Sequence, residues 1–198
     1  MSKVIDYYFS PVSPWTYMGH ARMHAIAKRH GATINVKPAD LGAIFSMSGG
    51  LPLPKRAPQR QAYRMFELKR WRDYLQIPLT LQPKFFPADS TNATLMIYAA
   101  KPEGSERQMQ LAGALLKACW AEERNIADLE ALRAIAREQG FDADKLLGAL
   151  ESQKPTYEAV TKEAIDRHVF GAPTFVYRDE PFWGQDRLEF LELALARA

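Results

Sequence analysis

The sequence predicts an α/β domain whose small sheet is built from both ends of the chain, with a large all-helical insertion between them. Two observations predict this architecture. A strand, a helix and a second strand follow one another in the first 38 residues, and a strand pattern returns only near residue 174. The 198 residues suffice for one domain with a substantial core, interrupted by an insertion.

The N-terminal segment has the pattern of a βαβ unit. Residues 4–9 are short, β-branched and aromatic, and a serine-proline pair follows them, as expected of a buried strand. Between residues 13 and 30 apolar side chains recur at helical spacing, and Gly31 supplies the stop. Residues 33–38 alternate in polarity, which predicts a second strand.

The middle of the chain predicts helices only. A loop rich in glycine and proline, at residues 46–58, precedes them, and Asp128 and Asp142 stand where helix N-caps are expected. We therefore divide the chain into a discontinuous α/β domain, residues 1–40 plus 160–198, and a helical insertion, residues 41–159. The predicted helices span residues 59–75, 92–100, 105–122, 128–139, 142–152 and 156–168.

The strand period returns directly after Ala172-Pro173. Residues 174–177 predict a strand, and a turn at residues 178–181 leads into an aromatic pair. Gly184 then precedes a last helix at residues 186–196.

The composition excludes several kinds of partner and favours a reducing compartment, which we expect to be the cytoplasm. The net charge of +3 is too small to predict nucleic-acid binding, and no run approaches the roughly 18 apolar residues that cross a membrane. A single cysteine, Cys119, excludes an internal disulfide and is expected in the core beside Trp120. His20 and His24 have the spacing of two metal ligands but no evident third, so we expect no metal.

Ser13-Pro14 is the most informative motif of the chain. Serine as N-cap and proline at the first helical position satisfy the rule for a helix start, and this structural role alone would explain them. The alternative is a binding site, because Ser13 follows the end of a strand and a helix start attracts anions. A hydroxyl can hold another molecule's thiolate but cannot exchange disulfides. This predicts glutathione as cofactor, bound by Ser13, Pro14 and Trp15.

Two further elements at strand ends are positioned to face Ser13. Ala172-Pro173 is either a trans proline that ends a loop or a cis proline that turns the backbone of Ala172 towards a peptide-like ligand. Gly184-Gln185-Asp186 is either a plain turn and helix cap or a second part of the site. In the second interpretation Asp186 binds the α-amino group of a glutamyl moiety, and backbone donors near Gln185 bind its carboxylate.

Basic and aromatic residues of the insertion are candidates for binding a second substrate. The segment 55–72 carries seven basic residues against one acidic residue, and such a run is usually a solvated helix face. Lys55 and Arg56 precede the helix, so they are better placed to reach an anionic substrate. Phe85 and Phe86 either wall an apolar pocket or pack in the core.

Three separated segments, residues 6–17, 169–174 and 182–189, together resemble the 2-hydroxychromene-2-carboxylate isomerases and the related kappa-class glutathione transferases. The resemblance runs essentially end to end and implies a DsbA-like thioredoxin fold with a helical insertion. It implies that the hydroxyl of Ser13 hydrogen-bonds the glutathione sulfur as the catalytic serine. It also implies that the backbone of Ala172 pairs with the cysteinyl part, that Gln185 and Asp186 contact the γ-glutamyl part, and that the protein is a homodimer.

The activity implied by this resemblance is a glutathione-dependent isomerisation in aromatic catabolism. The glutathione thiolate adds to 2-hydroxychromene-2-carboxylate, or to a similar anionic aromatic, the ring opens, and a bond rotates. Elimination then gives trans-o-hydroxybenzylidenepyruvate and regenerates the thiol. The resemblance is weaker in the region that would hold the aromatic substrate, for which the candidates are Phe45, Lys55, Arg56, Phe85 and Phe86.

Three other functions stay open at this point. A kappa-class-like transferase or peroxidase would consume glutathione, and a thioredoxin-fold binding module would have no catalytic activity. A thiol–disulfide oxidoreductase is disfavoured, because neither residue 13 nor residue 16 is a cysteine.

Overall fold

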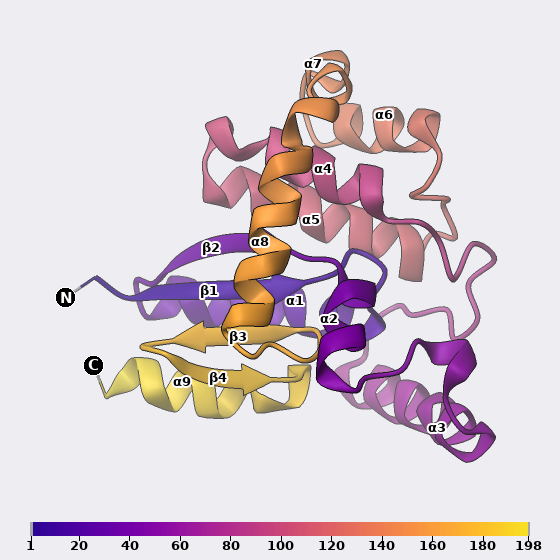
Figure 1. The fold of residues 1–198 in the computed structure, drawn as a ribbon, viewed down its shortest axis with the longest axis vertical. Helices are drawn as coiled ribbons and strands as arrows, with labels where there is room; N and C mark the ends of the chain where they lie inside the picture. The colour runs from indigo at the N-terminus through magenta and orange to yellow at the C-terminus, as the bar shows by residue number, and fades with distance from the viewer. Residues whose placement is uncertain (1, 198) are drawn as a thin grey trace.

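The computed structural model, which describes residues 2–197, is built on a four-stranded mixed sheet with the strand order β2-β1-β3-β4 (Figure 1). The first two strands are parallel and are joined by α1 (Pro14–Arg29), whereas β3 is antiparallel to both of its neighbours. The predicted βαβ unit and the sheet built from both chain ends are confirmed. The strands are β1 (Val4–Phe9), β2 (Thr33–Pro38), β3 (Thr174–Tyr177) and β4 (Glu180–Trp183).

Helices fill the chain between β2 and β3, as the sequence predicts. The caps at Asp128 and Asp142 are confirmed, since their carboxylates accept backbone N–H groups at 2.7 Å and 3.0 Å. None of the described helices combines the length and the apolar character needed to span a membrane. The helices after α1 are α2 (Leu41–Ser48), α3 (Pro58–Leu75), α4 (Thr91–Ala99), α5 (Ser105–Trp120), α6 (Leu129–Glu138), α7 (Ala143–Gly148), α8 (Lys154–Asp166) and α9 (Leu188–Ala196).

The structure corrects several of the expected boundaries, two of them next to strands of the sheet. The loop expected from residue 46 starts later, because residues 46–48 form the last turn of α2. Asp40 caps the start of this helix by accepting the N–H of Gly42 at 2.7 Å. The expected turn at residues 178–181 is shorter, because Arg178 and Asp179 both adopt positive φ and β4 starts directly after them. Pro181 fits within β4 because this is an edge strand, where a missing N–H costs no ladder bond.

The two faces of the sheet bury different helices. Tyr7 and Phe9 of β1 point into the main core with α1, α5 and α9, and both are at most 1% exposed. Tyr8, between them, points to the other face and packs with Ala164 of α8, as strand alternation requires. Figure 1 shows α8 crossing the front of the sheet with α1 and α9 behind it. The main core continues into α4, α5 and α6, so the division at residues 40 and 160 stays a prediction.

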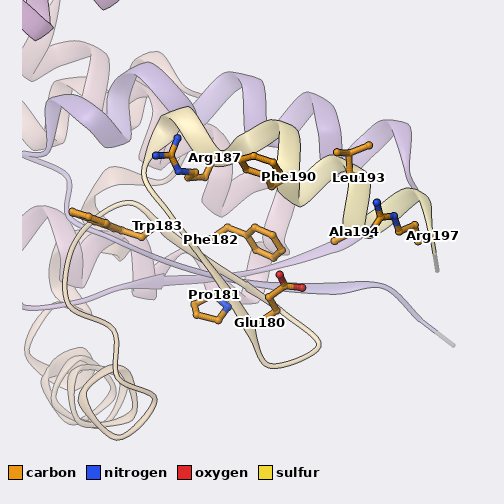
Figure 2. Close-up of a pocket in the computed structure, with 9 residues that line it drawn as sticks. All are labelled: Glu180, Pro181, Phe182, Trp183, Arg187, Phe190, Leu193, Ala194 and Arg197. Atoms are coloured by element: carbon orange, nitrogen blue, oxygen red, sulfur yellow. The ribbon is translucent and has the colours of Figure 1, made fainter.

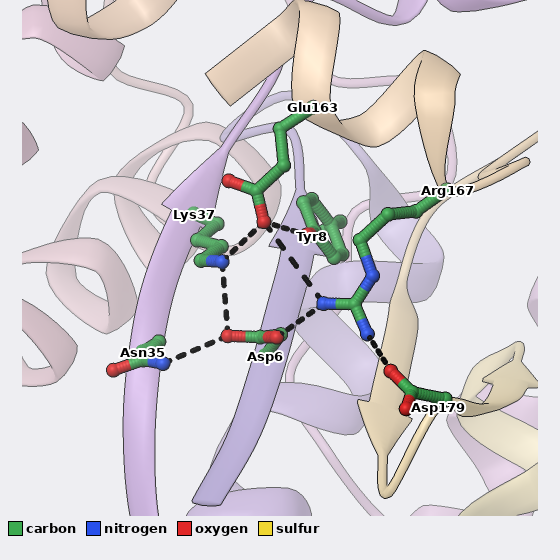
Figure 3. Close-up of polar contacts among 7 residues, drawn as sticks. All are labelled: Asp6, Tyr8, Asn35, Lys37, Glu163, Arg167 and Asp179. Carbon is green, nitrogen blue, oxygen red and sulfur yellow. Dashed lines mark hydrogen bonds and ion pairs between the residues drawn. The ribbon is translucent and has the colours of Figure 1, made fainter. Parts of the chain in front are cut away.

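A polar network ties β1 and β2 to α8 (Figure 3). Asp6 accepts a hydrogen bond from Asn35 at 2.8 Å and pairs with Lys37 at 3.0 Å and with Arg167. Glu163 of α8 accepts from Lys37 at 2.6 Å. Burial raises the pKa of the Asp6 carboxyl, but the hydrogen bonds from Asn35, Lys37 and Arg167 outweigh it and lower that pKa below 3.8.

Replacing Asp6 with asparagine is expected to lower the free energy of unfolding by about 1–2 kcal/mol at pH 7, because two half-buried cations lose a carboxylate. Since the native pKa of Asp6 is depressed, its contribution is complete above pH 3.8 and is lost as the pH falls through the native pKa. Urea denaturation at pH 7 and pH 3 measures both effects. The control is Asp179→Asn, which removes the 95% exposed partner of Arg167. An equal loss in the two variants would contradict the prediction.

Candidate active site

Strand register brings three predicted site elements to one end of the sheet. Tyr8 of β1 pairs with Thr174 of β3, and Thr174 pairs with Trp183 of β4. The next residues along these strands therefore lie side by side, and the N–H of Gly184 donates to the carbonyl of Pro173 at 2.8 Å. In Figure 1 this is the end of the sheet beside α2. The loops that carry Ser13, Ala172 and Asp186 all start from it.

Ser13 performs its expected structural role at the start of α1. Its Oγ accepts the N–H of Thr16 at 3.2 Å, its own N–H donates to Ser10, and Pro14 takes the first helical position. The residue is 7% exposed. A hydroxyl that accepts through a lone pair still has its hydrogen to donate, and at a helix N-terminus an anion is the favoured acceptor. The cap and the catalytic role are therefore compatible, while Trp15 lies half-buried against the core.

The second element is the bend that joins β3 to its preceding loop. The Ala172-Pro173 peptide is cis, as one of the two sequence interpretations required. Gly171 lies beneath the indole of Trp183, and a Cβ at this position would stand 2.4 Å from its Nε1. Glycine is thus needed where the ring covers the backbone. Ala172 itself is half-buried at the end of the sheet.

The third element, Gly184-Gln185-Asp186, forms a short 3-10 turn rather than the start of a regular helix, since α9 begins only at Leu188. Gln185 is 2% exposed, and Arg22 donates both to its Oε1 at 2.7 Å and to its backbone carbonyl at 3.2 Å, so neither of its oxygens is free to hold a ligand. Asp186 is 39% exposed and pairs with Arg187 at 2.9 Å. The carboxylate required for an α-amino group is therefore at the surface of the site.

The predicted second half of the site is only partly assembled. Arg56 lies over the ring of Phe45, with 5.9 Å between guanidinium and ring centroid. Phe86 packs against the ring of Trp120, with 49° between the two ring planes. Lys55 is exposed, and Phe85 lies under Lys84, at 5.2 Å.

Sequence reasoning missed Arg64. It was expected on a solvated helix face, but it is half-buried above Phe86 and Trp120, at 5.4 Å and 5.9 Å from their ring centroids. The two rings are themselves 4.8 Å apart. The four-residue spacing of Arg60 and Arg64 places them on one side of α3, but it does not distinguish the half-buried Arg64 from the exposed Arg60.

A separate groove of about 440 Å³ lies between β4 and α9 (Figure 2). It holds none of the predicted site residues and lies on the outer side of the edge strand. Its exposed apolar side chains include Trp183, Phe190 and Leu193, each about half exposed. The groove has no group placed to activate a thiol, so we do not assign the chemistry to it.

The remaining candidates have structural partners. Cys119 is 2% exposed, and burial raises the pKa of its thiol to about 12, which confirms a core role. His20 contacts the carbonyl of Met109, whereas His24 turns to Glu106. Among residues 2–197 no three His, Cys, Asp or Glu side chains gather as a metal site would require.

Comparison with known proteins places the chain in a family. A model of the DSBA-like thioredoxin domain matches residues 4–196. The 2-hydroxychromene-2-carboxylate isomerase of Pseudomonas putida is 34% identical over 200 residues, covering 98% of this chain and 95% of the relative. The chain belongs to the 2-hydroxychromene-2-carboxylate isomerase family of DsbA-like thioredoxin domains. The isomerase of Sphingobium xenophagum is 31% identical and covers 97% of both chains.

The wider comparisons agree with this family. A solved structure of a 2-hydroxychromene-2-carboxylate isomerase superposes with a TM-score of 0.84 at 30% identity, covering 98% of this chain and 95% of that one. Glutathione S-transferase kappa 1 of Caenorhabditis elegans is 25% identical over 94% of this chain and 88% of its own length. The cytosolic disulfide reductase DsbM of Pseudomonas aeruginosa, solved with GSH, shares the fold, with a TM-score of 0.69 at 20% identity, covering 98% of this chain and 99% of that one. The predicted thioredoxin-like fold is confirmed.

Proposed function

We propose that this protein is a glutathione-dependent isomerase that converts 2-hydroxychromene-2-carboxylate, or a similar anionic aromatic, to trans-o-hydroxybenzylidenepyruvate. The observation that carries the proposal is the position of the Ser13 hydroxyl at the N-terminus of α1, at the same sheet end as Ala172 and Asp186. The names of the relatives that cover nearly the whole chain support the substrate.

Thiol activation is the task of Ser13 and of the helix that it caps. A free thiol has a pKa of about 8.5 and is mostly protonated at pH 7. A helix N-terminus stabilises an anion by roughly 0.3–2 kcal/mol, and a hydrogen bond to a charged acceptor adds about 1.5–3 kcal/mol. At about 1.4 kcal/mol for each pKa unit, the two together lower the thiol pKa by about one to three units. A bound thiol is then largely ionised.

The reaction itself needs no net input of atoms or electrons. The thiolate sulfur forms a bond to the substrate, the ring C–O bond breaks and its oxygen takes a proton, and rotation follows about the bond that has become single. Departure of the sulfur as thiolate restores the double bond in the trans geometry, while the hydroxyl on the carbon that held the ring oxygen loses its proton and becomes the ketone, which balances the proton taken up on ring opening. Glutathione leaves unchanged, which separates this activity from that of a transferase.

Two measurements test the proposal directly. A crystal structure with glutathione is expected to place the sulfur within hydrogen-bond distance of Ser13 Oγ, and the ultraviolet absorbance of the thiolate is expected to titrate at lower pH than in free glutathione. Turnover with recovery of all glutathione supports the isomerase. Loss of one thiol per turnover would instead identify the kappa-class-like transferase, which the Caenorhabditis elegans relative makes the second candidate.

Asp186→Ala is expected to weaken glutathione binding about tenfold or more, because the α-amino group of the tripeptide loses a charged partner. The affinity is measured by calorimetry. Glu189→Ala is the control, since it removes an exposed carboxylate from the first turn of α9, three residues further along. If both variants bind glutathione as the parent does, Asp186 does not hold the γ-glutamyl group.

The proposal also includes a cytoplasmic location and a homodimer. The single cysteine, Cys119, is buried and its thiol pKa is raised, so it has no partner for an internal disulfide. This suits a reducing compartment. Sedimentation of the purified protein tests the dimer.

A further inference from the structure

The Arg64 guanidinium is half-buried without a negatively charged partner. Its side-chain polar contact is weak, from Nη1 to the sulfur of Met65 at 3.9 Å. Arg107, Arg124 and Arg167 are also partly buried, and each of them pairs with a carboxylate. Within the part of the chain that the structure describes, no carboxylate lies within ion-pair distance of Arg64. Its burial therefore carries an uncompensated cost.

Arg56 adds a second positive charge at the same place. Its Nε donates to the carbonyl of Leu51 at 2.7 Å, and it too has no carboxylate partner among residues 2–197. Burial, followed by the charge of Arg56, lowers the pKa of Arg64 to about 10. Two neighbouring positive charges that are partly removed from water are stabilised by a bound anion.

Aromatic rings line both cations. Phe45 lies under Arg56, while Phe86 and Trp120 lie under Arg64. The indole Nε1–H of Trp120, whose ring lies under Arg64, is buried with no acceptor in the structure. Flat apolar walls with donors above them suit a planar ligand that carries acceptor oxygens.

The cluster lies next to the helix that Ser13 caps. Helix α3, which carries Arg64, packs against α1. Tyr17, one turn into α1, donates its hydroxyl to the carbonyl of Pro78, just after α3, at 2.7 Å. Thr80, two residues after Pro78, donates its N–H to the carbonyl of Trp120 at 2.7 Å, so the residue whose ring lies under Arg64 is linked to the N-terminal part of α1, where the thiolate is proposed to stand.

We propose that Arg64, with Arg56, binds the carboxylate of the aromatic substrate, while the partly exposed Phe45 and Phe86 contact its ring. The guanidinium fork matches a carboxylate with two parallel hydrogen bonds, and aromatic rings stack on the planar body of the ligand. The identity of the ligand rests on the proposed function, but the preference for an aromatic anion does not. The pair therefore determines which electrophile meets the thiolate.

Arg64→Met is the decisive variant, because methionine keeps most of the apolar stem and removes the charge. Lys69→Met is its matched control, since it removes an exposed cation from the same helix. With 2-hydroxychromene-2-carboxylate, Arg64→Met is expected to raise KM at least tenfold with little change in kcat, and to leave glutathione affinity unchanged. Lys69→Met is expected to match the parent in all three quantities.

A binding measurement separates this inference from the proposed function. With glutathione present, calorimetry compares salicylate with its uncharged analogue salicylamide. The parent is expected to prefer salicylate at least tenfold, and Arg64→Met to lose that preference. This result supports the inference even if the parent fails to turn over the chromene carboxylate, in which case only the proposed function fails.

Three outcomes would overturn the inference. They are an unchanged KM and salicylate preference in Arg64→Met, an equal affinity of the parent for both probes, and a weakened affinity of Arg64→Met for glutathione alone. The third outcome would assign Arg64 to the tripeptide's own carboxylates. If Arg64→Met proves unstable on heating, Arg64→Gln replaces it, because glutamine also removes the charge while keeping a polar side chain, and the same loss of the preference for salicylate is expected.

Discussion

Ser13→Ala is expected to lower kcat/KM at least tenfold and to leave the fold intact. The variant loses the hydrogen bond that the Ser13 hydroxyl donates to the thiolate. A hydrogen bond to a charged acceptor is worth about 1.5–3 kcal/mol, which corresponds to a factor of about 10 to 150 in rate. The same substitution removes the N-cap that accepts from Thr16, which costs about 1 kcal/mol of stability. Activity is therefore expected to fall far more than stability.

Two controls separate the catalytic role from the capping role. Ser13→Thr keeps a hydroxyl that both caps and donates, so it is expected to retain most of the activity. Asp128→Ala removes the corresponding cap from α6, remote from the site, and is expected to lower the melting temperature without changing the rate. Steady-state kinetics and the thiolate absorbance of bound glutathione give the readouts. A Ser13→Ala enzyme with the parent's rate and thiol pKa would remove Ser13 from the mechanism.

The fold could be predicted because its deciding signals are local. A βαβ pattern within the first 38 residues and a strand pattern after Pro173 determine the parallel pair and its antiparallel neighbour. Helix α2 was missed because its apolar run adjoins Gly49-Gly50, and only the capping contact of Asp40 marks its start. The early start of β4 was missed because Pro181 reads as a turn residue, and its tolerance depends on β4 being an edge strand.

The site was predictable where backbone geometry determines it, and less so where side chains from distant segments meet. Ser13 could be assigned from its place between a strand and a helix. The direction of the Gln185 side chain depends on Arg22, 163 residues away in the sequence. Arg64 was assigned to a solvated face because a run of charges is usually exposed. The rings that cover it come from a later loop and from the end of α5.

The helix that carries Ser13 is held by a buried histidine, and this has a consequence at acid pH. His20, two turns into α1, donates its Nε2–H to the carbonyl of Met109 at 2.9 Å, because a carbonyl can only accept. Its Nδ1 therefore accepts from the hydroxyl of Tyr7, at 3.2 Å. The neutral ring links α1 to β1 and to α5. Gly113 of α5 admits this close approach, since a Cβ there would stand 3.1 Å from the ring.

Acidification from pH 7 to pH 4.5 is expected to reduce the free energy of unfolding by about 2 kcal/mol through His20 alone. Burial lowers the pKa of this ring to about 4, against the hydrogen bond to Met109, which raises it, and with a smaller lowering from the charge of His24. Because an unfolded histidine has a pKa of about 6.5, the unfolded chain binds the additional proton between pH 6.5 and 4, and stability falls across that window.

His20→Gln is expected to remove this part of the pH dependence, since a glutamine side chain supplies a donor and an acceptor but does not titrate. The readout is the difference in unfolding free energy between pH 7 and pH 4.5 by urea denaturation, compared within each variant so that repacking costs cancel. His24→Gln is the matched control, because it makes the same substitution at a neighbouring position of α1, where the histidine contacts Glu106 at 2.9 Å and is 24% exposed. If His20→Gln loses as much unfolding free energy between pH 7 and pH 4.5 as the parent does, another group titrates. Protonation of the ring that links β1, α1 and α5 would then not be the cause of the acid destabilisation.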